Sequence, residues 1–203
     1  MNLDGKKVLK YFPQPIFQYK VKNYKTHNED LSKYIYDLYE NDKEGLARSN
    51  RGGWHSKPFN LKEKDKPPFN FFMEIQSYVA DTFKEYGWRY TPGKVSLTEM
   101  WAIINKKNNF NLEHTHPNNY LSAAYYVKAP ENCGSFIVTN PNSVARERIP
   151  VSDNKTQFNQ NIVHIKPEEG DLLIFPAYLP HSVGMNLSDE NRIVISFNID
   201  ILK

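Results

Sequence analysis

Three of the six histidines have a spacing that could bind a metal ion. His114 and His116 stand in the segment EHTHP, and His181 follows His114 by 67 residues, in the segment FPAYLPHSV. Side chains two positions apart on an extended segment point to the same side of the chain. Both imidazoles could therefore face one ion, and His181 could reach it from another strand. Imidazole suits zinc, copper, iron and nickel.

An H-x-H pair is a weak signal by itself, because imidazole serves many purposes in proteins. The simplest alternative is a pair of exposed loop histidines before Pro117. The remaining histidines are interpreted as structural residues; they are His27, His55 and His164.

The segment after His181 strengthens the metal hypothesis. Arg192 follows by eleven positions and begins RIVISFNI, a clear strand pattern. One face of this strand is apolar and should pack into the core; the other is more polar and carries Arg192, Val194, Ser196 and Asn198. A polar strand face inside a small barrel makes sense if it lines a ligand cavity. The planar guanidinium would suit a carboxylate ligand, although an edge strand with a surface ion pair is the alternative.

A second predicted strand, residues 120–128, shows a matching pattern. Tyr120, Ser122, Ala124 and Tyr126 share one of its faces. The Tyr126 phenol and the Ser122 hydroxyl could reach into the same cavity. The alternative for Tyr126 is a core aromatic residue.

The elements that must position these residues divide the chain into two regions. Up to about residue 93 the pattern indicates a first strand near 15–21, a helix capped by Asn28, a polar loop over 41–66, and a helix from Pro67 that stops at Gly87. From about residue 94 short apolar runs alternate with turn signals, which predicts a sandwich, barrel or jelly roll. We expect one mainly β domain over residues 1–203, in which a helical N-terminal region (residues 1–93) covers the β core (residues 94–203).

The composition excludes several classes of protein. A net charge of +3 over 203 residues, with scattered lysines, argues against a nucleic-acid-binding protein. The single cysteine, Cys133, cannot form an intramolecular disulfide, which fits a reducing compartment. The N-terminal segment lacks an apolar signal core, and no run is long enough to span a membrane. These features predict a soluble cytoplasmic protein.

The motifs together resemble the 2-oxoglutarate/Fe(II) oxygenase superfamily. The similarity covers N-x-x-H-x-H-P, L-S-x-x-Y-Y-V, G-D-L-L-I-F-P, L-P-H-x-V and R-I-V-I-S-F-N, which are spread over residues 111–198. It resembles in particular a group of 2OG-Fe(II) oxygenases that also carries H-x-H-P, and the segments YFPQPIF and SNRGGWHS extend the likeness towards the N-terminus. The combination is far more specific than any single motif.

The resemblance implies a double-stranded β-helix, the jelly roll shared with cupins, with N-terminal helices packed on the sheet. It implies that Fe(II) is held by His114, His116 and His181. It also implies that Arg192 pairs with the C5 carboxylate of 2-oxoglutarate, and that O₂ is the second co-substrate. The co-substrate contacts expected beside Arg192 are Tyr126, Asn111, Ser122 and Asn105. No further catalytic side chain is required, and the primary substrate stays open.

The chain departs from the wider superfamily at three positions. His116 stands where a carboxylate usually completes the iron site; Glu113 could supply one instead, but as a neighbour of His114 it should point to the opposite face. Val194 replaces the hydroxyl residue usual two positions after the arginine, which could lower the affinity for 2-oxoglutarate. Ala123 replaces a glycine.

Two other functions are compatible with this pattern. A cupin-type iron dioxygenase with three histidines would need no 2-oxoglutarate, but the position of Arg192 argues against it. A non-catalytic jelly roll that binds sugar or protein would need no convergent histidines. Substrate contacts are expected at Asn198 and at Trp54, which belongs either to a lid over the site or to the packed core.

Overall fold

The computed structural model describes residues 5–147 and 149–202. Its helices are α1 (Tyr24–Asn41), α2 (Pro67–Glu85) and the short α3 (Ser143–Glu147). The strands are β1 (Phe17–Lys20), β2 (Asn50–Arg51), β3 (Trp54–His55), β4 (Val95–Asn105), β5 (Phe110–His114), β6 (Leu121–Lys128), β7 (Phe136–Thr139), β8 (Ile162–Ile165), β9 (Asp171–Pro176), β10 (His181–Val183) and β11 (Arg192–Ile201). None of the described helices is both long and apolar enough to cross a membrane.

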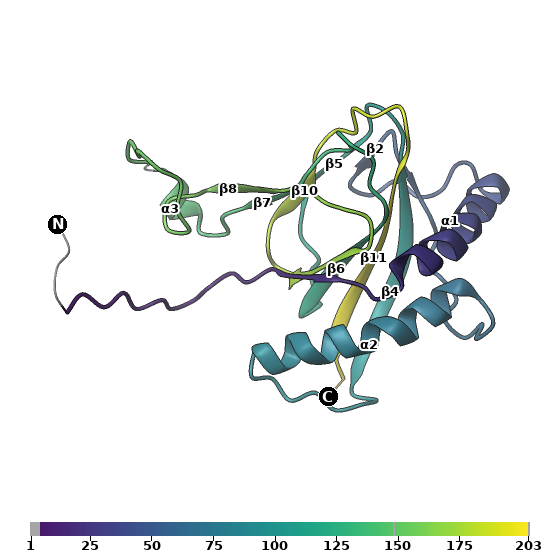
Figure 1. The fold of residues 1–203 in the computed structure, drawn as a ribbon, viewed down its shortest axis with the longest axis horizontal. Coiled ribbons are helices and arrows are strands. Elements are labelled where there is room, and N and C mark those ends of the chain that lie inside the picture. The colour runs from purple at the N-terminus through teal and green to yellow at the C-terminus, as the bar shows by residue number, and fades with distance from the viewer. Residues whose placement is uncertain (1–4, 148, 203) are drawn as a thin grey trace.

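The strands form two antiparallel sheets. The larger has the order β1-β9-β6-β11-β4-β3, and the smaller has the order β2-β5-β10-β7-β8 (Figure 1). Consecutive strands such as β4 and β5, or β9 and β10, lie in different sheets, so the chain winds back and forth between them. This is the predicted double-stranded β-helix. The β7–β8 hairpin with α3, and the segment 5–16 before β1, project from the body (Figure 1).

Helices α1 and α2 cover the outer face of the larger sheet, as predicted (Figure 1). The α2 side chains at helical spacing are fully buried: Phe71, Ile75, Val79 and Phe83. They pack against the side chains of β6 and β11 that point away from the space between the two sheets. The ring centroids of Phe71 and Tyr125, for example, are 4.4 Å apart. Burying a large apolar side chain contributes about 1.5–3 kcal/mol, so this interface stabilises the larger sheet from outside.

The start of α1 differs from the prediction. The helix begins at Tyr24, and Asn28 lies inside it rather than at its N-cap. The Asn28 side chain is buried, and its Oδ1 accepts a hydrogen bond of 2.6 Å from the Tyr125 hydroxyl. A contact across the core therefore determines the role of a residue whose type is otherwise typical of a cap.

The end of α2 depends on Gly87, which has a φ of +69°. The Gly87 N–H donates to the Lys84 carbonyl, and the Trp88 N–H donates to the Phe83 carbonyl. The Trp88 ring also packs on the Phe83 ring, with centroids 5.6 Å apart. This pair of hydrogen bonds and the hydrophobic contact make a Schellman motif, which needs a left-handed residue at this position.

Gly87→Ala is expected to lower the free energy of unfolding by about 1 kcal/mol, because a Cβ disfavours left-handed backbone. Apart from Gly87 and its chain neighbours, no heavy atom of the described residues lies within 4 Å of the position that the Cβ would take, so no steric clash adds to this cost. Urea denaturation measures the change. Gly87→Asn should cost less, because asparagine tolerates this conformation; equal stability of all three proteins would contradict the assignment.

Candidate active site

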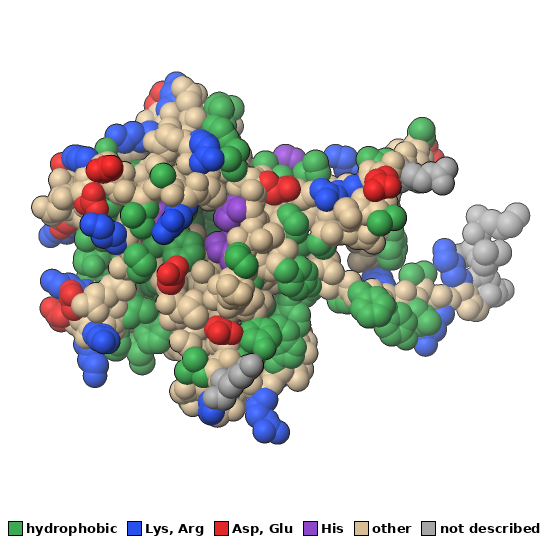
Figure 2. All heavy atoms as spheres, turned by 180° about the vertical axis from the view of Figure 1, so that it is seen from behind, with side chains coloured by type: hydrophobic (Ala, Val, Ile, Leu, Met, Phe, Trp, Pro, Cys, Tyr) green, Lys and Arg blue, Asp and Glu red, His purple; other side chains and the backbone are tan. Residues whose placement is uncertain are grey.

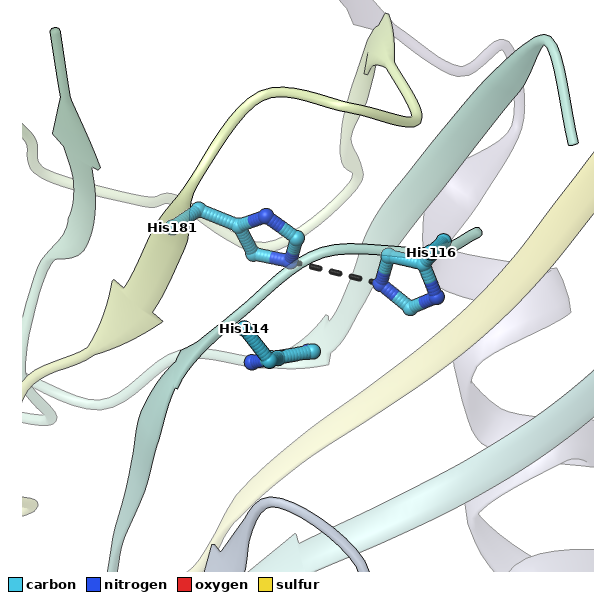
Figure 3. Close-up of side chains that lie close together, drawn as sticks. All are labelled: His114, His116 and His181. Atoms are coloured by element: carbon cyan, nitrogen blue, oxygen red, sulfur yellow. Dashed lines mark hydrogen bonds between the residues drawn. The ribbon is translucent and has the colours of Figure 1, made fainter. Parts of the chain in front are cut away.

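The three histidines predicted to bind metal converge between the two sheets (Figure 3). His114 ends β5 and His181 begins β10, and the two residues are direct register partners. His116 lies just beyond β5, where its backbone N–H donates to the Ala177 carbonyl at 2.8 Å. One candidate ligand nitrogen from each ring lies within 4.8 Å of the others. Sheet pairing thus brings together residues that are 67 positions apart in the chain.

Backbone carbonyls orient two of the rings. The Nδ1 of His114 lies 2.7 Å from the Leu112 carbonyl, and the Nδ1 of His181 lies 2.8 Å from the Leu179 carbonyl. In a neutral imidazole that donates from Nδ1, the Nε2 keeps its lone pair. Burial lowers the pKa of His181 to about 3, with a smaller effect from His114, and burial lowers the pKa of His116 to about 4. The rings are therefore neutral at pH 7 and available as ligands.

The geometry of these nitrogens fits a bound cation. The Nε2 atoms of His116 and His181 are 3.3 Å apart. Metal–nitrogen bonds of about 2 Å place neighbouring ligand nitrogens of an octahedral ion about 3 Å apart. Two lone pairs facing each other at this distance repel unless a proton or a cation lies between them. Three neutral imidazoles are a donor set that iron accepts.

Glu113 does not join this group. Its carboxylate accepts a hydrogen bond from the Thr139 hydroxyl on β7. Among the described residues, the metal-binding group around His114 contains histidines alone. This arrangement agrees with the expectation that neighbours on an extended strand point to opposite faces.

The histidines border a cavity of about 520 Å³ between the sheets. Figure 2 shows histidine side chains in a hollow of the surface, with charged side chains around its rim. The inner face of β11 lines this cavity, with Arg192, Val194, Ser196 and Asn198. The alternate residues, from Ile193 to Ile199, are fully buried against the helices. The two faces of β11 thus have the roles that the alternation predicts.

Arg192 is a fully buried side chain with unused hydrogen-bond donors. Its Nη1 donates to the carbonyls of Cys133 and Gly184, the latter at 2.9 Å. Its Nε and Nη2 are buried and have no partner within the described residues. These two groups form one edge of the guanidinium, which matches the two oxygens of a carboxylate. An unpaired buried charge is costly, so this edge is suited to an anionic ligand.

A family model described as "Putative 2OG-Fe(II) oxygenase" matches residues 99–198, the stretch that holds the three histidines and Arg192. The chain belongs to the 2-oxoglutarate- and Fe(II)-dependent oxygenases. This oxygenase is therefore an oxidoreductase that uses Fe(II), 2-oxoglutarate and O₂. No curated protein sequence matches it.

Several solved structures share this fold. A prolyl-4-hydroxylase from Pseudomonas putida has a TM-score of 0.66 and 11% identity, and the match covers 94% of both chains. HygX from Streptomyces hygroscopicus, with nickel and 2-oxoglutarate bound, has a TM-score of 0.64 and 12% identity over 93% of this chain and 83% of that chain. A prolyl hydroxylase from Trichoplax adhaerens has a TM-score of 0.61 and 14% identity over 92% and 83%. At such identities the likeness concerns the fold.

Three of the expected co-substrate contacts line the cavity of the oxygenase: Tyr126, Asn105 and Asn111. Asn105 is the register partner of Arg192, and Tyr126 is the register partner of Val194, so both lie at the Arg192 end of the cavity. Burial raises the pKa of Tyr126, which keeps the phenol protonated and able to donate a hydrogen bond. Asn111 connects to Asn105 through a weak contact of 3.5 Å between their amides.

Ser122, the fourth expected co-substrate contact, lies behind the cavity wall. It is fully buried and is not among the residues that line the cavity. Its hydroxyl lies 3.0 Å from Asn198 Oδ1, to which it donates, and Asn198 itself lines the cavity. Ser122 therefore orients a residue of the cavity wall, and its contact with the co-substrate stays a prediction.

Trp54 also lies away from the cavity of the oxygenase. Its ring packs against Tyr39 at 5.5 Å, and its Nε1 donates to the Asp42 carbonyl at 2.6 Å. In this structure Trp54 belongs to the packed core, which is the second of the two alternatives. The next residue, His55, lines the cavity instead. A step of one residue along a strand moves the side chain to the other face.

Several side chains of the cavity were not predicted from the sequence. Glu99 and Trp101 line it from β4, and His55 stacks on Trp101 with centroids 5.5 Å apart and an interplanar angle of 11°. Trp101 also approaches the ring of His116, at 6.0 Å. The sequence could have indicated Glu99 and Trp101, because they stand at alternate positions of β4 with Asn105 and therefore share its face of the strand.

Proposed function

We propose that the oxygenase binds Fe(II) through His114, His116 and His181, anchors the C5 carboxylate of 2-oxoglutarate on Arg192, and hydroxylates a primary substrate. One observation carries the proposal: a fully buried arginine with two unpaired donors lines the same cavity as three neutral imidazoles. A cupin-type dioxygenase without 2-oxoglutarate would have no use for that arginine. A non-catalytic jelly roll would have no use for the three imidazoles.

The bound iron, 2-oxoglutarate and O₂ supply the oxidation, in which 2-oxoglutarate yields succinate and CO₂ and one oxygen atom enters a C–H bond of the substrate. The side chains and backbone of the protein position the metal ligands and the co-substrate. The carbonyls of Leu112 and Leu179 hold two imidazoles in the tautomer that offers Nε2. Arg192 holds the far end of the co-substrate, and the apolar walls around Phe136 and Phe175 exclude water from the reacting atoms.

This proposal is tested by succinate formation. Purified protein with Fe(II), 2-oxoglutarate and O₂ should release succinate, and extracts incubated with it should contain products heavier by one oxygen atom. Both signals should require Fe(II) and 2-oxoglutarate together. Products that form equally without 2-oxoglutarate would contradict the proposal and favour the cupin-type reaction.

Val194→Thr is expected to tighten the binding of 2-oxoglutarate. Val194 is the next inward residue after Arg192 and offers no hydrogen bond to a carboxylate there. One added hydrogen bond to a charged group contributes about 1.5–3 kcal/mol, so the Kd should fall about tenfold or more. Calorimetric titration measures the Kd. Val194→Ala, which frees space but adds no donor, is the control, and equal tightening by both variants would contradict the reason given.

We extend the proposal to the organisation and setting of the protein. Residues 1–203 form one domain, since the helices and the larger sheet share a hydrophobic core. Cys133 is buried and free, which is consistent with a reducing compartment such as the cytoplasm.

A further inference from the structure

The inner face of β11 is longer than 2-oxoglutarate requires. Arg192 pairs in register with Asn105 at one end, and Asn198 pairs with Glu99 at the other. The six residue-to-residue steps between Arg192 and Asn198 span about 20 Å of strand. A five-carbon diacid anchored at Arg192 covers a fraction of that length. The end near Asn198 is therefore left for a second molecule.

Four side chains on the neighbouring strands β4 and β11 form this second region, which we call the outer subsite: Glu99, Trp101, Ser196 and Asn198. Trp101 is 7% exposed, and its Nε1 is buried with no hydrogen-bond partner in the described stretches of the chain. Leaving such a donor unsatisfied is costly, so the indole is suited to a ligand that brings an acceptor. Because Trp101 lies beside His116, a molecule bound here is next to the proposed iron site.

Opposite charges flank the outer subsite. Glu99 on β4 and Arg48, in the segment before β2, both line the cavity. Within residues 5–147 and 149–202 neither side chain takes part in a salt bridge, so they do not pair with each other. Arg51, the other arginine of the rim, instead donates to the carbonyls of Arg48 and Asn50.

Both charges lie near His55, the ring stacked on Trp101. Burial lowers the pKa of His55, with smaller effects from Arg48, which lowers it, and from Glu99, which raises it. Glu99 and Arg48 therefore both lie close enough to the His55 ring to affect its pKa. They are nevertheless too far from each other to form a salt bridge. Glu99 would repel a purely anionic ligand, and Arg48 would repel a purely cationic one.

We propose that the outer subsite binds a zwitterion of the amino-acid class, with its ammonium group at Glu99, its carboxylate at Arg48 and its carbon chain against Trp101. This inference rests on the proposed function, because it identifies the chemical class of the primary substrate.

Calorimetry on the protein loaded with Ni(II) and 2-oxoglutarate, without turnover, tests the inference. The probes are the common L-amino acids and ω-amino acids of increasing length, each with its methyl ester, which lacks the negative charge, and its N-acetyl derivative, which lacks the positive one. At least one zwitterion should bind saturably, and both of its derivatives should bind about tenfold more weakly or worse. Saturable binding by no zwitterion, or equal binding by the derivatives, would overturn the inference.

Two variants assign the charges. Glu99→Gln should remove the advantage of the zwitterion over its N-acetyl derivative, and Arg48→Gln should remove its advantage over the methyl ester. Glu29→Gln and Arg89→Gln change exposed charges outside the cavity and should leave both preferences intact. Retention of both preferences in the first two variants would also overturn the inference.

The 2-oxoglutarate titration of each sample separates the two proposals. If 2-oxoglutarate binds and no zwitterion does, the outer subsite is wrongly assigned and the proposed function stands. If zwitterions bind through Glu99 and Arg48 while 2-oxoglutarate does not bind, the proposed function fails and the subsite stands.

Discussion

His181→Ala is expected to abolish iron binding and, with it, succinate formation. The substitution removes one of three nitrogens from a site whose remaining ligands, His114 and His116, are too few to hold the ion tightly. Loss of a group that merely supports a metal ligand costs about 10–100-fold in affinity, so loss of the ligand itself should cost more than about 100-fold. Metal content after dialysis and the affinity for Mn(II) as an iron substitute both measure the effect.

The His181 ring also fills space between Phe136 and Phe175, with centroids 5.2 and 4.7 Å away. His181→Gln is therefore a useful second variant, because its amide can keep the hydrogen bond to the Leu179 carbonyl and most of the volume. It should fold and still bind iron poorly. His164→Ala changes an exposed histidine on β8 and is the matched control. Full metal occupancy in either His181 variant would refute the ligand assignment.

Metal binding should also raise the stability of the folded protein. A ligand that binds only the native state raises the free energy of unfolding by an amount that grows with its concentration relative to Kd. The melting temperature of the wild-type protein should rise on addition of Mn(II), and that of the His181 variants should not.

Arg192→Met is expected to have opposite effects on function and on stability. Without the guanidinium, the C5 carboxylate loses a buried charge partner, which costs about 2–5 kcal/mol, or about 30-fold or more in the Kd of 2-oxoglutarate. Iron binding should be unaffected, because Arg192 is not a candidate ligand. Succinate formation at low 2-oxoglutarate should fall accordingly.

In the absence of 2-oxoglutarate the same variant should be more stable than the wild type. Arg192 is fully buried, with two donors unpaired among the described residues, and burial lowers the pKa of its guanidinium. Replacing a buried ionic group by an apolar side chain of similar length is often stabilising by about 1–4 kcal/mol. Urea denaturation without and with saturating 2-oxoglutarate measures both effects.

Arg192→Lys separates charge from shape, because lysine keeps the charge but lacks the fork. Its affinity for 2-oxoglutarate should lie between those of the wild type and Arg192→Met. A purely structural arginine would give the reverse result: lower stability in Arg192→Met and an unchanged 2-oxoglutarate Kd.

The sequence determined much of the fold, because strand alternation and helix periodicity are local properties of the chain. The inward face of β11, with Arg192 and Asn198, followed from parity alone. The same rule placed His114 and His116 on one side of an extended segment. The apolar stripe of α2 likewise predicted which face of that helix is buried.

Only the tertiary structure decided which side chains meet across strands. The pairing of β5 with β10 brought His181 to His114, and the pairing of β6 with β11 put Ser122 behind Asn198. Trp54 was expected at the cavity, but its neighbour His55 lines it, because adjacent residues of a strand point to opposite faces. The unpaired edge of Arg192 is likewise a property of its surroundings, because a hydrogen bond left unmade depends on every neighbour. Local pattern fixes the direction in which a side chain points, whereas the register between strands fixes what it meets there.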